Sequence, residues 1–170
     1  IDTSFKRPKY LSLDSTPLLD VIKYTINKYD KLNIKFTEIF LISSCNPLIK
    51  IADLNKGYRL FKKYKMKYPI MPIIKFPIPI NWALTLSNES IKEISKNNFN
   101  QKSQNFKNYY YDSSSFYIFS RDILKFNSVD EYINSFKSFE VSQFNSIDID
   151  NMDDWKLAEA IYNFNKKNEK

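Results

Sequence analysis

Hydrophobic residues along this chain recur at two spacings, one typical of helices and one typical of strands. Helical spacing predicts a first helix that is capped by Ser15 or Thr16 and has Pro17 in its first turn. Its buried stripe is expected to consist of Leu18, Val21, Ile22, Thr25, Ile26 and Tyr29. The same spacing predicts helices at 51–64 and 130–136, and a last helix that Asn151 or Asp153 caps.

Short apolar runs between these helices predict strands. The run 36–44 is typical of a strand covered on both faces. The run 69–76 predicts a second strand, which Pro72 restricts to an edge or a bulge because proline donates no ladder hydrogen bond. Further strands are expected within 109–119 and at 146–150, and 83–86 is expected to pair with the region 91–94 outside the main sheet. Strands that alternate with helices imply an α/β fold with a mostly parallel sheet covered by helices.

The stretch that follows residue 146 carries the main candidate chemistry. In a strand, the two isoleucines of Ile147-Asp148-Ile149-Asp150 share one face and the two aspartates share the other. At about 3.3 Å per residue, the aspartate Cα atoms lie about 6–7 Å apart, so both carboxylates can reach one divalent cation. The alternative is that both aspartates only solvate a sheet edge, because D-x-D is a short and common pattern.

The residue types present narrow the kind of site. The chain has no histidine and one cysteine, Cys45, which excludes the usual zinc sites and Ser/His or Cys/His nucleophiles within it. Any metal must be held mainly by oxygen, which favours Mg²⁺ or Mn²⁺. A single cysteine also excludes an internal disulfide and fits a reducing, cytoplasmic location.

Charge and glycine content limit the possible partners. The net charge is +7, but the lysines are spread along the chain, so we expect a mild attraction for anionic substrates and no nucleic-acid partner. The sequence contains no run of about 18 apolar residues, so we expect no membrane span. The start of the chain also lacks the apolar region of a signal peptide. The only glycine is Gly57, so a glycine-rich phosphate loop is excluded from these 170 residues.

Five blocks of the chain, in the same order, resemble the acylneuraminate cytidylyltransferase family. The family patterns are R-P-x-x-L-S-x-D-x-T, F-x-x-P-I-x-x-A-L, R-S-Q-D-L, H-D-A-G-Q-F-Y and D-I-D-x-x-x-D-W-x-x-A-E. The similar blocks here are Arg7-Pro8 with Leu11-Ser12, Asp14 and Thr16; 76–80 with Ala83-Leu84; 102–106; 111–117; and 148–150 with Asp154-Trp155 and Ala158-Glu159. The Ser-Gln and Asp-Trp variants point to the pseudaminic acid branch.

The resemblance implies a Rossmann-like sheet of the nucleotide-diphospho-sugar transferase type and a nucleotidyl transfer. CTP and a nine-carbon acidic sugar, of the pseudaminic or sialic acid type, would give the CMP-sugar and pyrophosphate. By this resemblance Asp148 and Asp150 are the catalytic and metal-binding residues. The residues near the cytidine would be Arg7, Asp14, Ser15 and Thr16, and those near the sugar would be Lys102, Gln104, Phe116 and Tyr117.

The chain also departs from the family. Lysine replaces arginine at Lys102, asparagine replaces aspartate at Asn105, cysteine replaces threonine at Cys45, and serine replaces glycine at Ser114, where a left-handed turn would be strained. The family's opening strand and its P-A-R-G-G-S-K-type phosphate loop would lie before Ile1. We therefore expect 1–170 to be one partial domain, incomplete at its N-terminus, with impaired activity and marginal stability by itself.

The family is dimeric, and 76–110 is stiffened by prolines, rich in aromatic residues and outside the main alternation. We expect this segment to protrude and to form a homodimer contact. Two other functions remain open, a D-x-D metal-dependent glycosyltransferase and an inactive binding module. On residue type alone Lys102 is a surface lysine, and Phe116 and Tyr117 are core aromatics.

Overall fold

The computed structural model describes residues 5–126 and 128–168, with the side chains of 129 and 130 left out. The chain divides into two compact units, each described by itself. Residues 1–41, 56–70 and 117–137 belong to the first unit, and residues 42–55, 71–116 and 138–170 belong to the second.

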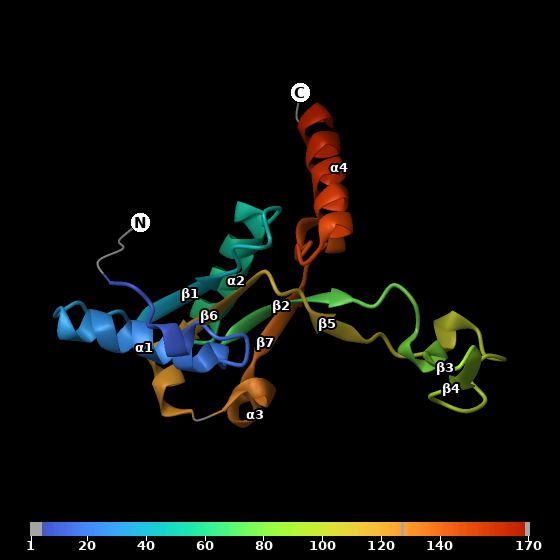
Figure 1. Cartoon of the computed structure of the whole chain (residues 1–170), viewed down its shortest axis with the longest axis horizontal. Coiled ribbons are helices and arrows are strands. Elements are labelled where there is room, and N and C mark those ends of the chain that lie inside the picture. Colours follow the sequence, from blue (N-terminus) through green and yellow to red (C-terminus); the bar gives the residue numbers. More distant parts are fainter. Residues whose placement is uncertain (1–4, 127, 169–170) are drawn as a thin grey trace. The chain divides into compact units, whose positions relative to one another are not determined.

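The helices and strands alternate as the sequence predicts, and the fold is α/β (Figure 1). The helices are α1 (Leu18–Lys31), α2 (Ile51–Lys63), α3 (Val129–Tyr132) and α4 (Met152–Asn168). The strands are β1 (Glu38–Ile42), β2 (Ile70–Lys75), β3 (Leu84–Ser87), β4 (Ser90–Glu93), β5 (Tyr110–Asp112), β6 (Phe116–Ser120) and β7 (Lys137–Glu140). The predictions of a helix at 51–64 and of a short helix near 130–136 are therefore confirmed, the latter as α3 followed by a 3-10 turn.

The core of the first unit lies beneath α1. Apolar side chains of this helix pack against residues of β6 and of the segment that follows it, and the buried cluster consists of Leu19, Ile22, Ile26, Phe119, Ile123 and Tyr132. The predicted stripe is correct for Ile22 and Ile26 but wrong for Leu18, which is exposed while Leu19 is buried. The predicted cap is also wrong. The N-cap position is occupied by Pro17, which has no side-chain acceptor, so no side chain caps the helix; Thr16 lies one residue earlier, where its Oγ1 donates to the Tyr10 carbonyl.

Two ion pairs in the first unit connect residues that are far apart in the sequence. The Arg121 guanidinium pairs with Asp30, and Lys62 pairs with Glu38 of β1. The hydrogen bonds from these cations lower the pKa of Asp30 and of Glu38 below the usual carboxyl value. The sequence predicted that β1 is covered on both faces, and this prediction is wrong. Ile39 and Leu41 pack on the core, whereas Phe40 and Ile42 are 40% and 50% exposed.

The main sheet has the strand order β1-β6-β2-β5, and β7 also pairs with β2. Every pairing of β2 whose register is described is antiparallel, with Ile70 opposite Ile118 in β6, and Ile73 opposite Asp112 in β5. The expectation of a mostly parallel sheet is therefore not met for these pairs. A parallel pair needs a crossover connection, and the chain instead returns from β2 to β5 through the helix-poor segment 76–109.

Pro72 lies in β2 at an interruption of the ladder, as the sequence predicted for a bulge. Between the pairs Ile70–Ile118 and Ile73–Asp112, β2 has two residues (71 and 72) and the opposite chain has five (113 to 117). The extra residues form the loop 113–115, whose Ser113 N donates to the Pro72 carbonyl at 3.2 Å. The predicted strand within 109–119 is accordingly divided into β5 and β6.

The prediction of a strand at 146–150 is wrong. Residues 146–149 are irregular, and the last strand of the sheet is β7, ahead of them. Strand β7 pairs with β2, and backbone hydrogen bonds at its two ends run from Lys137 N to the Pro69 carbonyl and from Val141 N to the Ile73 carbonyl. The segment 146–149 is instead bonded to the segment that follows β1, from Ile149 N to the Cys45 carbonyl at 2.9 Å.

The predicted small pair of strands outside the main sheet is confirmed as the hairpin β3–β4 (Figure 1). Leu86 lies opposite Ile91, and the turn residues Asn88 and Glu89 both have positive φ, as a two-residue type I′ turn requires. All eight strand residues are exposed.

Candidate functional site

The start of α4 is fixed by a reciprocal cap. Asn151 Oδ1 accepts hydrogen bonds from the backbone N–H groups of Asp153 and Asp154, at 2.9 and 3.1 Å. In return, Asp154 Oδ2 accepts from the N–H groups of Asp150 and Asn151, both at 3.1 Å. This arrangement is a capping box, and it confirms Asn151 as the cap. It also holds the backbone of Asp150 in a defined position.

Asp148 lies half-buried next to Ile147 and Ile149, just ahead of this cap. Burial raises the pKa of the Asp148 carboxyl above its ordinary value, and the negative charges of Asp150, Asp154 and Asp112 raise it further. The expected alternation, with isoleucines inside and aspartates outside, is therefore wrong for Asp148. The consequence is a desolvated carboxylate in a negative field, which a bound cation would relieve.

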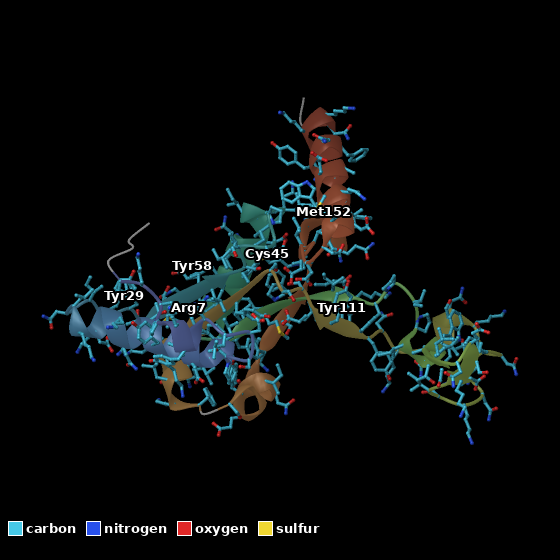
Figure 2. All side chains as sticks on the ribbon, viewed as in Figure 1. Arg7, Tyr29, Cys45, Tyr58, Tyr111 and Met152 are labelled. Atoms are coloured by element: carbon cyan, nitrogen blue, oxygen red, sulfur yellow. The ribbon has the colours of Figure 1, made fainter. Side chains whose placement is uncertain are left out.

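A buried polar network adjoins these carboxylates, and sequence analysis missed it. Asn46 Nδ2 donates to the Ser113 carbonyl at 3.5 Å, and the Ser113 and Ser115 hydroxyl oxygens are 2.7 Å apart. Asn46, Ser113 and Ser115 are each 2% exposed. Since Ile149 N donates to the carbonyl of Cys45, the dipeptide 45–46 is hydrogen-bonded both to the loop after Asp112 and to the Asp148 segment. The neighbouring residues Cys45 and Tyr111 are labelled in Figure 2.

The loop 113–115 contains the expected strained turn. Ser114 has φ 53°, in the left-handed region that favours glycine, and its backbone N–H donates to Asp112 Oδ1 at 2.9 Å. This is the position at which the resembling family has glycine. The turn orients Asp112, a residue of the Y-D-S-S-S-F-Y block to which sequence analysis gave no role.

The carboxylates suit a cation that needs few protein ligands. Within 5–126 and 128–168, no three or more His, Cys, Asp or Glu side chains are grouped closely enough to hold a metal ion. Mg²⁺ keeps several waters and is commonly bound through one or two carboxylates together with substrate phosphates. Asp148 and Asp150 are therefore candidates for a site with two carboxylate ligands, and the described residues around them do not form a closed cage.

The residues expected near the sugar are divided between a cavity and the core. Gln104 lines a cavity of about 290 Å³ between 75–79 and 103–109, together with Lys75, Lys107 and Tyr109. Lys102 is exposed, directly before the 3-10 turn that carries Gln104. Phe116 is 1% exposed and Tyr117 packs against the core of the first unit, so the structure places both rings in the core and does not bring them to this cavity.

The residues expected near the cytidine gather in a local turn of the first unit. Arg7 Nε donates to Ser12 Oγ at 3.1 Å, and Ser12 Oγ donates to the Pro8 carbonyl. Asp14 and Ser15 are exposed, and Thr16 is half-buried. These four residues thus lie within one stretch of ten residues, outside the unit that contains Asp148 and Asp150.

No protein-family model matches this chain, and a comparison with curated proteins finds no match either. In the part of the chain that the structure describes, none of the helices is long and apolar enough to cross a membrane.

Proposed function

We propose that this chain is part of a cytidylyltransferase that transfers CMP from CTP to a nine-carbon acidic sugar of the pseudaminic or sialic acid type. The observation that carries the proposal is the half-buried carboxylate of Asp148, which precedes the capped start of α4. The negative charges of Asp150, Asp154 and Asp112 all act on this carboxylate. A half-buried carboxylate with other carboxylates around it is expected where a cation and phosphates bind, because the cation removes the repulsion among the negative charges.

The proposal needs a Rossmann-like sheet, and one strand pair, β2 with β7, has the parallel direction of such a sheet. The bonds Lys137 N to Pro69 O and Val141 N to Ile73 O advance by the same number of residues on both strands, which is the pattern of a parallel pair. The bonds Arg121 N to Thr37 O and Ser43 N to Ser115 O run in opposite directions along β6 and β1. In this interpretation β1, β2 and β7 run the same way, and β6 is the reversed strand between β1 and β2.

The left-handed Ser114 is a second support. It occupies the glycine position of the H-D-A-G-Q-F-Y pattern, and the backbone conformation there is the one that glycine favours. A strained residue persists only where the surroundings hold it, and such residues cluster at functional sites. On the proposed function, the chain would keep the turn of that pattern with serine in place of glycine.

Asp148 and Asp150 would hold Mg²⁺ or Mn²⁺, which when bound supplies charge neutralisation for the transferred phosphate. The chain's own contribution is positioning: the capping box fixes Asp150, and the bond to Cys45 fixes the segment of Asp148. Lys75 and Lys107 bring positive charge to the cavity that Gln104 lines, which suits a sugar carboxylate. Arg7, Asp14, Ser15 and Thr16 are proposed for the cytidine, and the reducing cytoplasm is proposed as the compartment.

The test is pyrophosphate release by the protein expressed from its complete gene, with CTP, Mg²⁺ and pseudaminic acid. Asp150→Asn is expected to lower kcat by about 100-fold or more, because it removes charge from the cation site. Asp153→Asn is the matched control, since Asp153 lies three residues further on, in the first turn of α4, where its side chain is 89% exposed and pairs with Lys156. Equal rates for the Asp150→Asn and Asp153→Asn variants would refute the assignment, and turnover of a sugar nucleotide in place of CTP would favour a glycosyltransferase.

We also propose a homodimer contact through the hairpin β3–β4. In the register of this hairpin Leu84, Leu86 and Ile91 share one face, and Leu86 is 75% exposed. Glu93, opposite Leu84, completes this face. An isolated two-stranded hairpin is marginally stable in water, and a partner surface would cover the three exposed apolar side chains. Leu86→Glu is expected to convert a dimer into a monomer in light scattering, whereas Ser87→Glu on the other face leaves the mass unchanged. A monomeric wild type at tens of micromolar would contradict the contact.

A further inference from the structure

Three residues of the last sequence block, Trp155, Ala158 and Glu159, have no role in the proposed function. They line one cavity of about 310 Å³, and its other lining residues are Pro47, Leu48, Ile149 and Tyr162. All seven residues belong to the second unit. The block that caps the start of α4 thus also forms the wall of a cavity along this helix, which is called the α4 groove below.

The α4 groove has an apolar floor and an aromatic rim. Ala158 and Leu48 are 4% and 8% exposed, whereas Trp155 and Tyr162 are each 54% exposed. The two aromatic residues are seven positions apart, which is about two helical turns, so they share one face of α4. The faces of tryptophan and tyrosine rings attract cations.

Glu159 lies between the two aromatic residues on this face. It follows Trp155 by four positions and precedes Tyr162 by three, and side chains at these spacings are neighbours on a helix. Its carboxylate is exposed and has no ion pair or hydrogen bond with any residue that the structure describes. Asp153 differs in this respect, because it pairs with Lys156. The α4 groove therefore combines two aromatic faces with a carboxylate that is available to a cation.

A second cavity, of about 350 Å³, continues the α4 groove towards the end of the helix. It shares Pro47, Leu48 and Tyr162 with the first cavity, and Lys50 and Lys166 also line it. The groove thus has a carboxylate at one end and two ammonium groups at the other. A bound cation is repelled by the lysines and attracted by the carboxylate, so its charged group belongs at the end nearer the start of α4.

We propose that the α4 groove binds an arginine side chain of another protein at its Glu159 end. A guanidinium group stacks on aromatic faces and pairs with a carboxylate through two parallel hydrogen bonds. Its methylene stem can lie on an apolar floor while the charged group stays at the rim. The inference is independent of the proposed function, because neither Asp148 nor Asp150 takes part in it.

The remaining surface of α4 favours a protein over a free small cation. Ala158 is the one buried residue among those described in this helix, and Leu157 and Phe164 are 49% and 67% exposed. Apolar surface of this kind is covered in protein interfaces, where arginine is enriched among the contact residues. A partner that inserts an arginine can cover these side chains as well, which a small cation cannot do.

The experiment uses the protein expressed from its complete gene, labelled with 5-fluorotryptophan and followed by fluorine NMR. The signal of Trp155 is the one that disappears in Trp155→Phe. The probes are the tripeptide acetyl-Leu-Arg-Leu-amide, the same tripeptide with neutral citrulline in place of arginine, and n-butylguanidinium as a free cation. The arginine tripeptide is expected to shift the Trp155 signal saturably with a Kd of about 10 mM or below, at least about tenfold lower than the Kd of either other probe.

Two charge variants on the same part of the chain test the position of the site. Glu159→Gln is expected to raise the Kd of the arginine tripeptide about tenfold or more and to remove its advantage over the citrulline tripeptide. Asp153→Asn is the matched control, because it removes the same charge from α4 at a residue outside the groove. Asp150→Asn is expected to leave the Kd unchanged, so the fate of the proposed metal site does not affect this test.

The outcomes are distinct. A missing shift, or equal shifts with the arginine and citrulline tripeptides, would overturn the proposal even if Glu159→Gln failed to fold, because this comparison uses the wild type. Binding of n-butylguanidinium as tight as that of the arginine tripeptide would assign the groove to a free cation and overturn the protein partner. A wild-type oligomer that Glu159→Gln dissociates in light scattering would assign the groove to a second copy of this chain and would equally overturn it.

Discussion

Ser114 gives a stability prediction that can be worked out from one dihedral angle. At φ 53° its Cβ crowds the following carbonyl, which costs about 1–2 kcal/mol for an L-residue other than glycine. Glycine removes this strain but loses about 0.5–1 kcal/mol through the greater freedom of the unfolded chain. The net effect of Ser114→Gly is a stabilisation of about 0.5–1 kcal/mol.

The assay is urea unfolding at constant pH. With a slope of about 2 kcal/mol per M, the gain corresponds to a midpoint about 0.25–0.5 M higher. Ser114→Ala is the control for loss of the hydroxyl alone, and no gain is expected from it because alanine has the same Cβ. Ser115→Gly is the control for glycine at a neighbouring position, and it is expected to destabilise because it removes a buried hydroxyl that contacts Ser113. A midpoint of Ser114→Gly at or below the wild-type value would refute the strained turn.

Two further predictions concern the acidic site and the core. Asp148→Asn is expected to stabilise the metal-free protein at pH 7, because the folded state raises the pKa of this carboxyl and so favours its neutral form. The gain should shrink as pH falls from the raised pKa towards the ordinary value of 3.8, and urea midpoints at pH 7 and near pH 4 test this; a constant gain would contradict it. Leu19→Ala is expected to cost about 2–5 kcal/mol and Leu18→Ala less than about 0.5 kcal/mol, because Leu19 is 2% and Leu18 49% exposed. Similar costs in thermal melts would show that α1 buries a different face.

Local patterns predicted the local structure well. The helix α2 and the hairpin β3–β4 depend on residues close in sequence, and both were found within one or two residues of the predicted bounds. The cap by Asn151 is local in the same sense. The cap expected from Ser15 or Thr16 failed because the helix begins one residue later than predicted, with Pro17 at the N-cap position.

Predictions that depended on distant pairing were less successful. The sequence pattern does not show that the chain returns from β2 to β5 without a crossover helix, so the antiparallel pairs were missed. The Asp148 segment has strand-like alternation but forms no strand, and β7 takes the place beside β2. Asn46 was missed because an asparagine before a proline is usually read as a turn residue, and only the structure shows that it is buried.

The central claim is the transfer of CMP to an acidic sugar, and phosphorus NMR of the products tests it most directly. The protein from its complete gene is incubated with CTP, Mg²⁺ and pseudaminic acid, and the spectrum is followed until CTP is consumed. We expect a phosphodiester signal of a CMP-sugar and a pyrophosphate signal in equal amounts, both absent without the sugar. Formation of CDP and inorganic phosphate, or unchanged CTP in the presence of the sugar, would contradict the account.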